Sequence, residues 1–154
     1  MTRDEILAME PGREMDAVVA EAMGYQVSWW SLMPAEHKGD FNEWRPAMYG
    51  DSEIYAPAKY GDMPGKEMLR YGRWVGIPHY STDISAAWPL IEEARTAPGM
   101  GGCKACVEVH STDSKYTDTP YWALIHGHMG EGKNAPEAIC KAYLLWRESE
   151  NERD

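Results

Sequence analysis

Apolar residues recur at helical spacing in three separate stretches of the chain. Near the amino terminus we expect a short helix, whose Thr2 and Glu5 have the spacing of a capping box, then a turn and a longer helix with Pro11 in its first turn that carries the first stretch. Of the longer helices, the second is expected to begin after Ser81 or Thr82, and the third after Asn134. The apolar faces of these helices are predicted to be Met15, Val18, Val19, Ala22 and Met23; Ile84, Ala87, Trp88, Ile91 and Ala94; and Ala138, Ile139, Ala142, Leu145 and Trp146.

Between the second and third helices the apolar pattern changes from helical to alternating. Apolar residues alternate over 105–109 and again over 121–129, on either side of a polar turn at 113–119. This arrangement predicts a β-hairpin. On a strand that spans 121–129, His126 and His128 would point to the same side of the sheet.

Residues 26–79 have a different composition from the rest of the chain. Proline and glycine recur there too often for a long helix, yet aromatic residues are dense, which is not typical of a disordered linker. We therefore expect an ordered, loop-rich layer with short strands, or one helical turn around Gly65–Tyr71. The aromatic residues of this layer are Trp29, Trp30, Phe41, Trp44, Tyr49, Tyr55, Tyr60, Tyr71 and Trp74.

The order of these elements predicts an α+β fold. Helices before, between and after a small antiparallel sheet or hairpin fit a layered α/β/α sandwich, with the aromatic layer inserted at about 26–79. A chain of 154 residues suits a single domain over 1–154.

Charge and hydropathy exclude some classes of function. The net charge of −10 argues against coating of a DNA duplex, which requires many phosphate contacts from Lys and Arg. No apolar run approaches the roughly 20 residues that a membrane span needs. The polar amino terminus does not resemble a signal peptide, and three cysteines do not suggest a disulfide framework, so we expect a cytoplasmic protein.

Three segments together suggest a family. They are Met15-Asp16-Ala17-Val18-Val19-Ala20-Glu21, Pro78–Trp88 with its Tyr-Ser-Thr-Asp core, and Asn134–Ala142 with its Ala-Ile-Cys core. The chain resembles the phage ABA sandwich domain family in these segments, although Pro89 departs from the family pattern. The resemblance implies the layered fold and a small phage protein that acts in the host cytoplasm. Most proteins of that family have no assigned function.

A metal site is one candidate chemistry. Cys103 and Cys106 have zinc-ligand spacing, and His110, His126 and His128 lie on or beside the predicted hairpin. A structural zinc site usually takes four ligands from two such pairs, and the sequence has no second cysteine pair. We therefore predict no metal or cofactor, and a metal-dependent hydrolase stays the least favoured alternative.

Signatures of covalent catalysis and of phosphate-binding loops are incomplete. No Gly-x-Ser-x-Gly elbow occurs, and Ser81 is best explained as a helix cap. Gly130 to Lys133 lack the upstream glycine and the following hydroxyl residue of a Walker sequence, so they are interpreted as a loop that leads into Asn134.

The feature with most functional content is the basic and aromatic end of the 26–79 layer. The whole layer is close to neutral, but between Lys59 and Arg73 basic residues outnumber acidic ones and alternate with aromatic residues. Aromatic faces stack on bases, and Arg or Lys binds phosphate. The residues predicted to bind the ligand are Lys66, Arg70, Tyr71, Arg73, Trp74, His79, Tyr80, Ser81 and Thr82.

These residues suit a pocket for a nucleotide-sized anion. Because no catalytic set is recognisable, and because the family resemblance implies a phage protein, we expect a homo-oligomeric binding protein that sequesters a nucleotide-type immune signal. The main alternative is a module that binds a host or phage protein through the same aromatic surface, since Tyr, Trp, Met and Arg are also enriched at protein interfaces.

Overall fold

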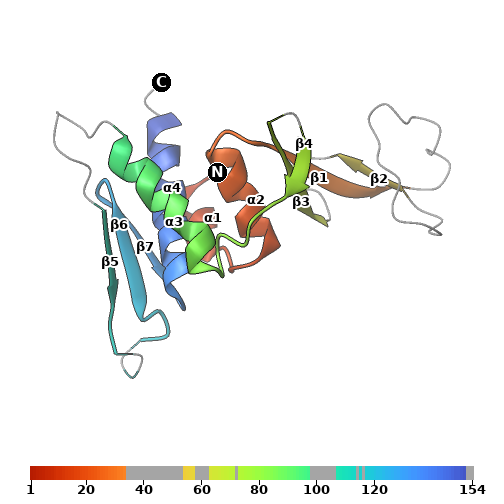
Figure 1. The fold of residues 1–154 in the computed structure, drawn as a ribbon. Helices are drawn as coiled ribbons and strands as arrows, with labels where there is room; N and C mark the ends of the chain where they lie inside the picture. The colour runs from red at the N-terminus through yellow and green to blue at the C-terminus, as the bar shows by residue number, and fades with distance from the viewer. Residues whose placement is uncertain are drawn as a thin grey trace.

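The fold consists of four helices and seven strands in the part of the chain that the structure describes (Figure 1). This computed structural model describes residues 1–33, 54–57, 63–71, 73–97, 107–113, 115 and 117–151. Within these ranges only the backbone is described for residues 28–33, 54–57, 63–67, 73, 74 and 107. The predicted α+β class is confirmed. The elements are α1 (Arg3–Ala8), α2 (Arg13–Ala22), β1 (Gln26–Met33), β2 (Ile54–Pro57), β3 (Met63–Arg70), β4 (Arg73–Gly76), α3 (Ile84–Thr96), β5 (Val107–Ser111), β6 (Tyr121–Ile125), β7 (His128–Gly132) and α4 (Ala135–Asn151).

Helix α4 is the centre of the molecule. Every residue from Pro136 to Trp146 is buried, so this helix is enclosed on all sides rather than amphipathic. It packs against β6 and β7 on one side and against α1, α2 and α3 on the other. At its start the Asn134 side chain accepts a hydrogen bond from the Glu137 amide at 2.8 Å, as the sequence predicts for a cap.

Two glycines allow α4 to lie directly on strand β7. A Cβ atom added at Gly130 would lie 2.4 Å from the Ala138 carbonyl oxygen and 2.4 Å from the Ala142 amide nitrogen. At Gly132 it would lie 2.8 Å from the Ala138 nitrogen. The interpretation of residues 130–133 as a loop was therefore wrong for 130–132, which end strand β7 and whose glycines permit close helix packing, while Lys133 follows the strand.

Strands β5, β6 and β7 form an antiparallel sheet in that order. The predicted hairpin between β5 and β6 is confirmed by the pairing of Val109 with Ala123. The prediction of one strand over 121–129 was wrong, because His126 (φ 50°) and Gly127 (φ 85°) form a tight turn and the chain reverses into β7. Two successive positive φ angles match the twist of such a hairpin turn.

The segment after α2 builds a second antiparallel sheet with the order β2-β1-β3-β4. The expected short strands are thus present, and residues 65–70 are a strand rather than a helical turn. Met68 of β3 is fully buried against the core, and α2 packs along β3. In Figure 1 the helices lie between the two sheets, and β1 and β2 extend away from the helices.

Helix α3 begins later than predicted and presents a different face. Its cap is Asp83, whose side chain accepts the Ser85 amide at 2.8 Å, so neither Ser81 nor Thr82 caps it. Ile84 and Trp88, which were expected to face the core, are exposed. Leu90 takes their place, so the buried residues are Ala87, Leu90, Ile91 and Ala94.

Candidate functional site

The turn between β3 and β4 presents an aromatic and a basic residue to solvent. Tyr71 is 91% exposed, and its backbone has a φ of 51°, in the left-handed region. The Arg70 guanidinium carbon lies 5.3 Å from the centre of the Tyr71 ring, within cation–π range. Both residues belong to the predicted ligand-binding set.

Three other members of that set have described backbones only. Lys66 lies in β3, and Arg73 and Trp74 begin β4, where Arg73 pairs with Arg70 and Trp74 with Leu69. Their side chains lie outside the described residues.

Tyr80 lies inside the protein and belongs to the same buried core as Met68 of β3. Its phenol has a pKa raised to about 12, chiefly by burial and next by the charge of ionised Tyr25, while the charge of Arg70 opposes the rise.

Ser81 is buried and forms part of a polar junction with α2. Its amide and its hydroxyl both donate to Asp16 Oδ1, at 2.8 Å and 2.7 Å. Its Oγ accepts the Gly12 amide at 2.9 Å. Asp16 is fully buried, so these hydrogen bonds satisfy a carboxylate that would otherwise be costly in the core.

Arg13 and His79 also approach the Asp16 carboxylate. Arg13 Nη1 donates to Asp16 Oδ2 at 3.1 Å and to the Ile77 carbonyl at 2.9 Å. His79 Nδ1 lies 3.8 Å from the same Asp16 oxygen, while its side chain is 66% exposed. His79 and Thr82 are exposed members of the predicted set, whereas Tyr80 and Ser81 are buried.

Two of the segments that carry the family resemblance meet at this junction, Asp16 from α2 and Ser81 from the Tyr-Ser-Thr-Asp segment. Cys140 of the third segment, on α4, is fully buried. Burial raises the pKa of the Cys140 thiol, and the charges of Asp16 and Glu137 raise it further. The thiol therefore stays protonated and acts as a packed core side chain.

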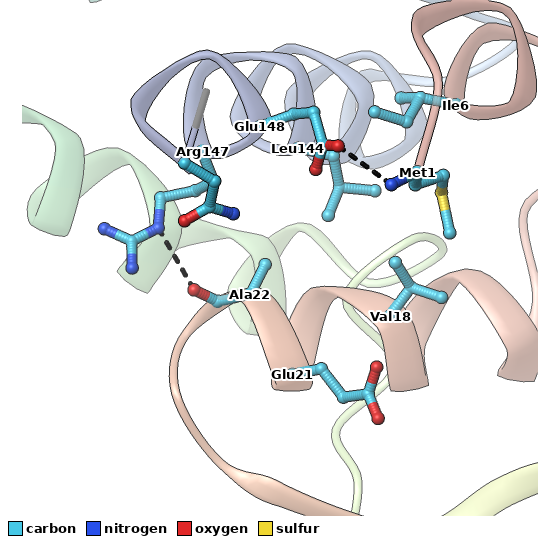
Figure 2. A pocket seen from close by; sticks show the side chains of 9 residues that line it. Met1, Ile6, Val18, Glu21, Ala22, Leu144, Arg147 and Glu148 are labelled. Atoms are coloured by element: carbon cyan, nitrogen blue, oxygen red, sulfur yellow. Dashed lines mark hydrogen bonds and ion pairs between the residues drawn. The ribbon is translucent and has the colours of Figure 1, made fainter. Parts of the chain in front are cut away.

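A separate cavity of about 340 Å³ opens between α1, α2 and α4 (Figure 2). Three of its charged groups already have partners. The Met1 ammonium lies 2.8 Å from Glu148 Oε1, and Arg147 Nε donates to the Ala22 backbone carbonyl at 3.1 Å. Its walls contain residues other than the predicted ligand-binding set. The lining residues are Met1, Ile6, Val18, Glu21, Ala22, Leu144, Arg147, Glu148 and Asn151.

The structure separates the histidines of the metal alternative. Among the described residues, no group of three or more His, Cys, Asp or Glu side chains is positioned to hold a metal ion. Cys103 and Cys106 lie outside the described residues. The hydrogen-bond partners of the histidines are the Ala94 carbonyl for His126 (2.8 Å), the Ser149 hydroxyl for His128 (3.1 Å) and the Glu108 carboxylate for His110 (3.2 Å).

Comparisons with known proteins found a structural likeness to one solved structure. No family model and no curated protein matches the chain. A crystal structure of a phage protein from Bacillus cereus ATCC 14579 aligns over 89% of this chain and 91% of that chain, with 23% sequence identity and a TM-score of 0.49. A likeness at this level carries no functional argument, and the resemblance to the phage ABA sandwich domain family stays a prediction from sequence.

The helices of the described residues include none that is both long and apolar enough for a membrane span.

The roles of Arg13 and Asp16 were not predicted from the sequence. An acidic residue between Met15 and Ala17, inside an apolar helical stretch, was the available signal, because a buried carboxylate requires partners. Those partners lie 65 positions away in the sequence, so only the fold identifies them.

Proposed function

We propose that this chain is a non-catalytic binding protein that sequesters a small nucleotide-type anion. In line with the family resemblance, we propose that the anion is an immune signal and that the protein removes it in the cytoplasm of an infected host. The observation that carries the proposal is the presentation of Tyr71 and Arg70 at the tip of the β3–β4 hairpin.

Tyr71 combines a costly backbone conformation with an exposed ring. A left-handed backbone costs a bulky residue about 1–2 kcal/mol, which Gly or Asn largely avoids. At 91% exposure its ring recovers little of this by burial. A tyrosine at this position is best explained by a contact outside the chain.

The chemistry of the pair suits a nucleotide. One face of an exposed Tyr ring can stack on a base, which contributes roughly 1–3 kcal/mol per base. The neighbouring Arg70 guanidinium supplies hydrogen-bond donors for phosphate. The guanidinium of Arg13 adds a cationic group beside the adjacent segment, and the exposed imidazole of His79 adds a polar one.

The same surface also has features that suit a protein partner. Val75, on the strand after the tip, is 36% exposed, so Tyr71 has an apolar neighbour on the hairpin. Tyr and Arg are also the residues that most often dominate protein interfaces. A protein-binding module is therefore the second candidate function.

Calorimetric titration with cyclic and linear nucleotides tests the proposal. Tyr71→Asn should weaken binding at least tenfold, because it removes the stacking face, while folding stability stays unchanged or rises slightly. Met129→Ala is the matched control, since it removes a large exposed side chain from β7, in the other sheet, and should leave affinity unchanged.

Two results would count against sequestration. One is the absence of binding to every nucleotide in the panel. The other is a native mass spectrum, from cells with an active nucleotide-based defence, in which the protein carries a second protein and no small molecule. The latter result would favour the protein-binding module.

A further inference from the structure

The outer face of α3 carries two large apolar side chains in solvent. Ile84 is 46% exposed and Trp88 is 53% exposed. They are four residues apart, so they lie one above the other on the same side of the helix. Glu92 and Arg95 continue this line, and we call these four residues the α3 strip.

The α3 strip is held on a rigid support. Ala87, Leu90 and Ala94, on the opposite side of the helix, are fully buried, and α3 packs along α4. A partner that binds the strip therefore meets side chains on a fixed backbone, which lowers the entropic cost of association.

The charges of the strip cancel. Arg95 Nη1 donates to Glu92 Oε1 at 3.3 Å, so the strip has no net charge although the chain carries −10. A partner attracted by electrostatic steering would instead meet the acidic parts of the surface. Two copies of an acidic protein approach each other with least repulsion through a neutral, apolar strip.

We propose that the α3 strip is the interface between two copies of this chain. In an antiparallel pair with a two-fold axis near Trp88 and Pro89, the two indoles meet at the centre. Arg95 then lies opposite Asp83 of the partner subunit, and the reverse contact forms by symmetry. Asp83 is exposed at the start of α3, just before the strip, and Arg95 is exposed at the end of α3, so the two ends of the helix are complementary in charge.

Analytical ultracentrifugation of the full chain tests this interface over about 1–200 µM. The wild-type protein should form a dimer. Trp88→Glu should raise the dimer Kd by at least about 30-fold, as expected for a central aromatic residue. Met129→Glu is the matched control, because Met129 is 45% exposed on β7 and should leave the Kd unchanged.

A second pair of variants tests the charge contact. Arg95→Glu should raise the Kd several-fold, because it places two acids opposite each other, whereas Lys115→Glu, at a position that is also exposed, should have no effect. Thermal melts should show that all four variants fold like the wild type. A monomeric wild type, a Trp88→Glu variant that dimerises normally, or a dimer lost only in Met129→Glu would each overturn the proposal.

Discussion

Substitution of Gly130 by alanine should be among the most damaging single changes in this protein. The added Cβ would lie 2.4 Å from the Ala138 oxygen and the Ala142 nitrogen, about 1 Å closer than the 3.4 Å at which ordinary contact begins. Both atoms belong to the backbone of α4, so no side chain can rotate away. Either α4 or β7 must move.

The size of the effect follows from what α4 contacts. All residues from Pro136 to Trp146 are buried, so a shift of the helix loosens the whole core. A gap of 0.5–1 Å already removes roughly a quarter to a half of the dispersion energy of each contact. Overpacking usually costs about 1–3 kcal/mol, and a backbone clash at the central helix should reach about 3 kcal/mol or more.

Urea denaturation followed by far-ultraviolet circular dichroism measures this loss. Gly132→Ala should cost less than Gly130→Ala, because its nearest contact is 2.8 Å and part of its surroundings is the Glu137 side chain. Gly76→Ala is the control, since it meets nothing within 4 Å and should change the unfolding free energy by less than about 1 kcal/mol. A Gly130→Ala variant as stable as Gly76→Ala would refute the account of helix and sheet packing.

Two further predictions concern the polar groups beside the hairpin. Asp16→Ala leaves the Ser81 amide without its acceptor in the core and the Ser81 hydroxyl with the Gly12 carbonyl at 3.3 Å in place of the carboxylate. The free energy of unfolding should therefore fall by about 2–4 kcal/mol in urea titrations, whereas Asp16→Asn, which keeps one oxygen, should lose less. Equal, small losses would contradict the role of this junction. The pKa of Tyr80 is raised to about 12, chiefly by burial. The folding stability that depends on its neutral phenol is therefore fully present below pH 10 and is lost as the pH rises to 12. Stability should fall there by up to about 2–3 kcal/mol, and Tyr80→Phe should remove that part of the decrease; coincident stability profiles for the two proteins would show that Tyr80 does not titrate as stated.

The sequence predicted the elements whose signals are local and left open those that depend on distant partners. The last helix followed from the Asn134 cap and a long apolar stretch, and the structure has it. Strand β7 was missed because Gly130 and Gly132 are typical of a loop, and nothing local distinguishes a flexible glycine from one that makes room for a helix. The face of α3 was misjudged because Ala87 and Ile91 fit two overlapping apolar faces, and only packing against α4 selects one of them.

The candidate site divides in the same way. Arg70 and Tyr71, which the alternating basic and aromatic pattern marks as ligand-binding residues, are both exposed, and their binding role stays a prediction. The hydroxyl of Ser81 was assigned to a cap because Ser commonly caps the next helix, whereas its acceptor is a carboxylate on α2. Sequence spacing carries no information about such a pairing across 65 residues.

The bond between Asp16 and Ser81 has a consequence for how this protein can evolve. It joins α2, the helix that precedes the β1–β4 sheet, to the segment that follows the sheet and leads into α3. The two chain segments that flank the sheet are thus held together by contacts outside the sheet. Changes to exposed residues of the sheet, such as Tyr71, therefore leave this junction intact, and evolution can vary them at little cost in folding stability.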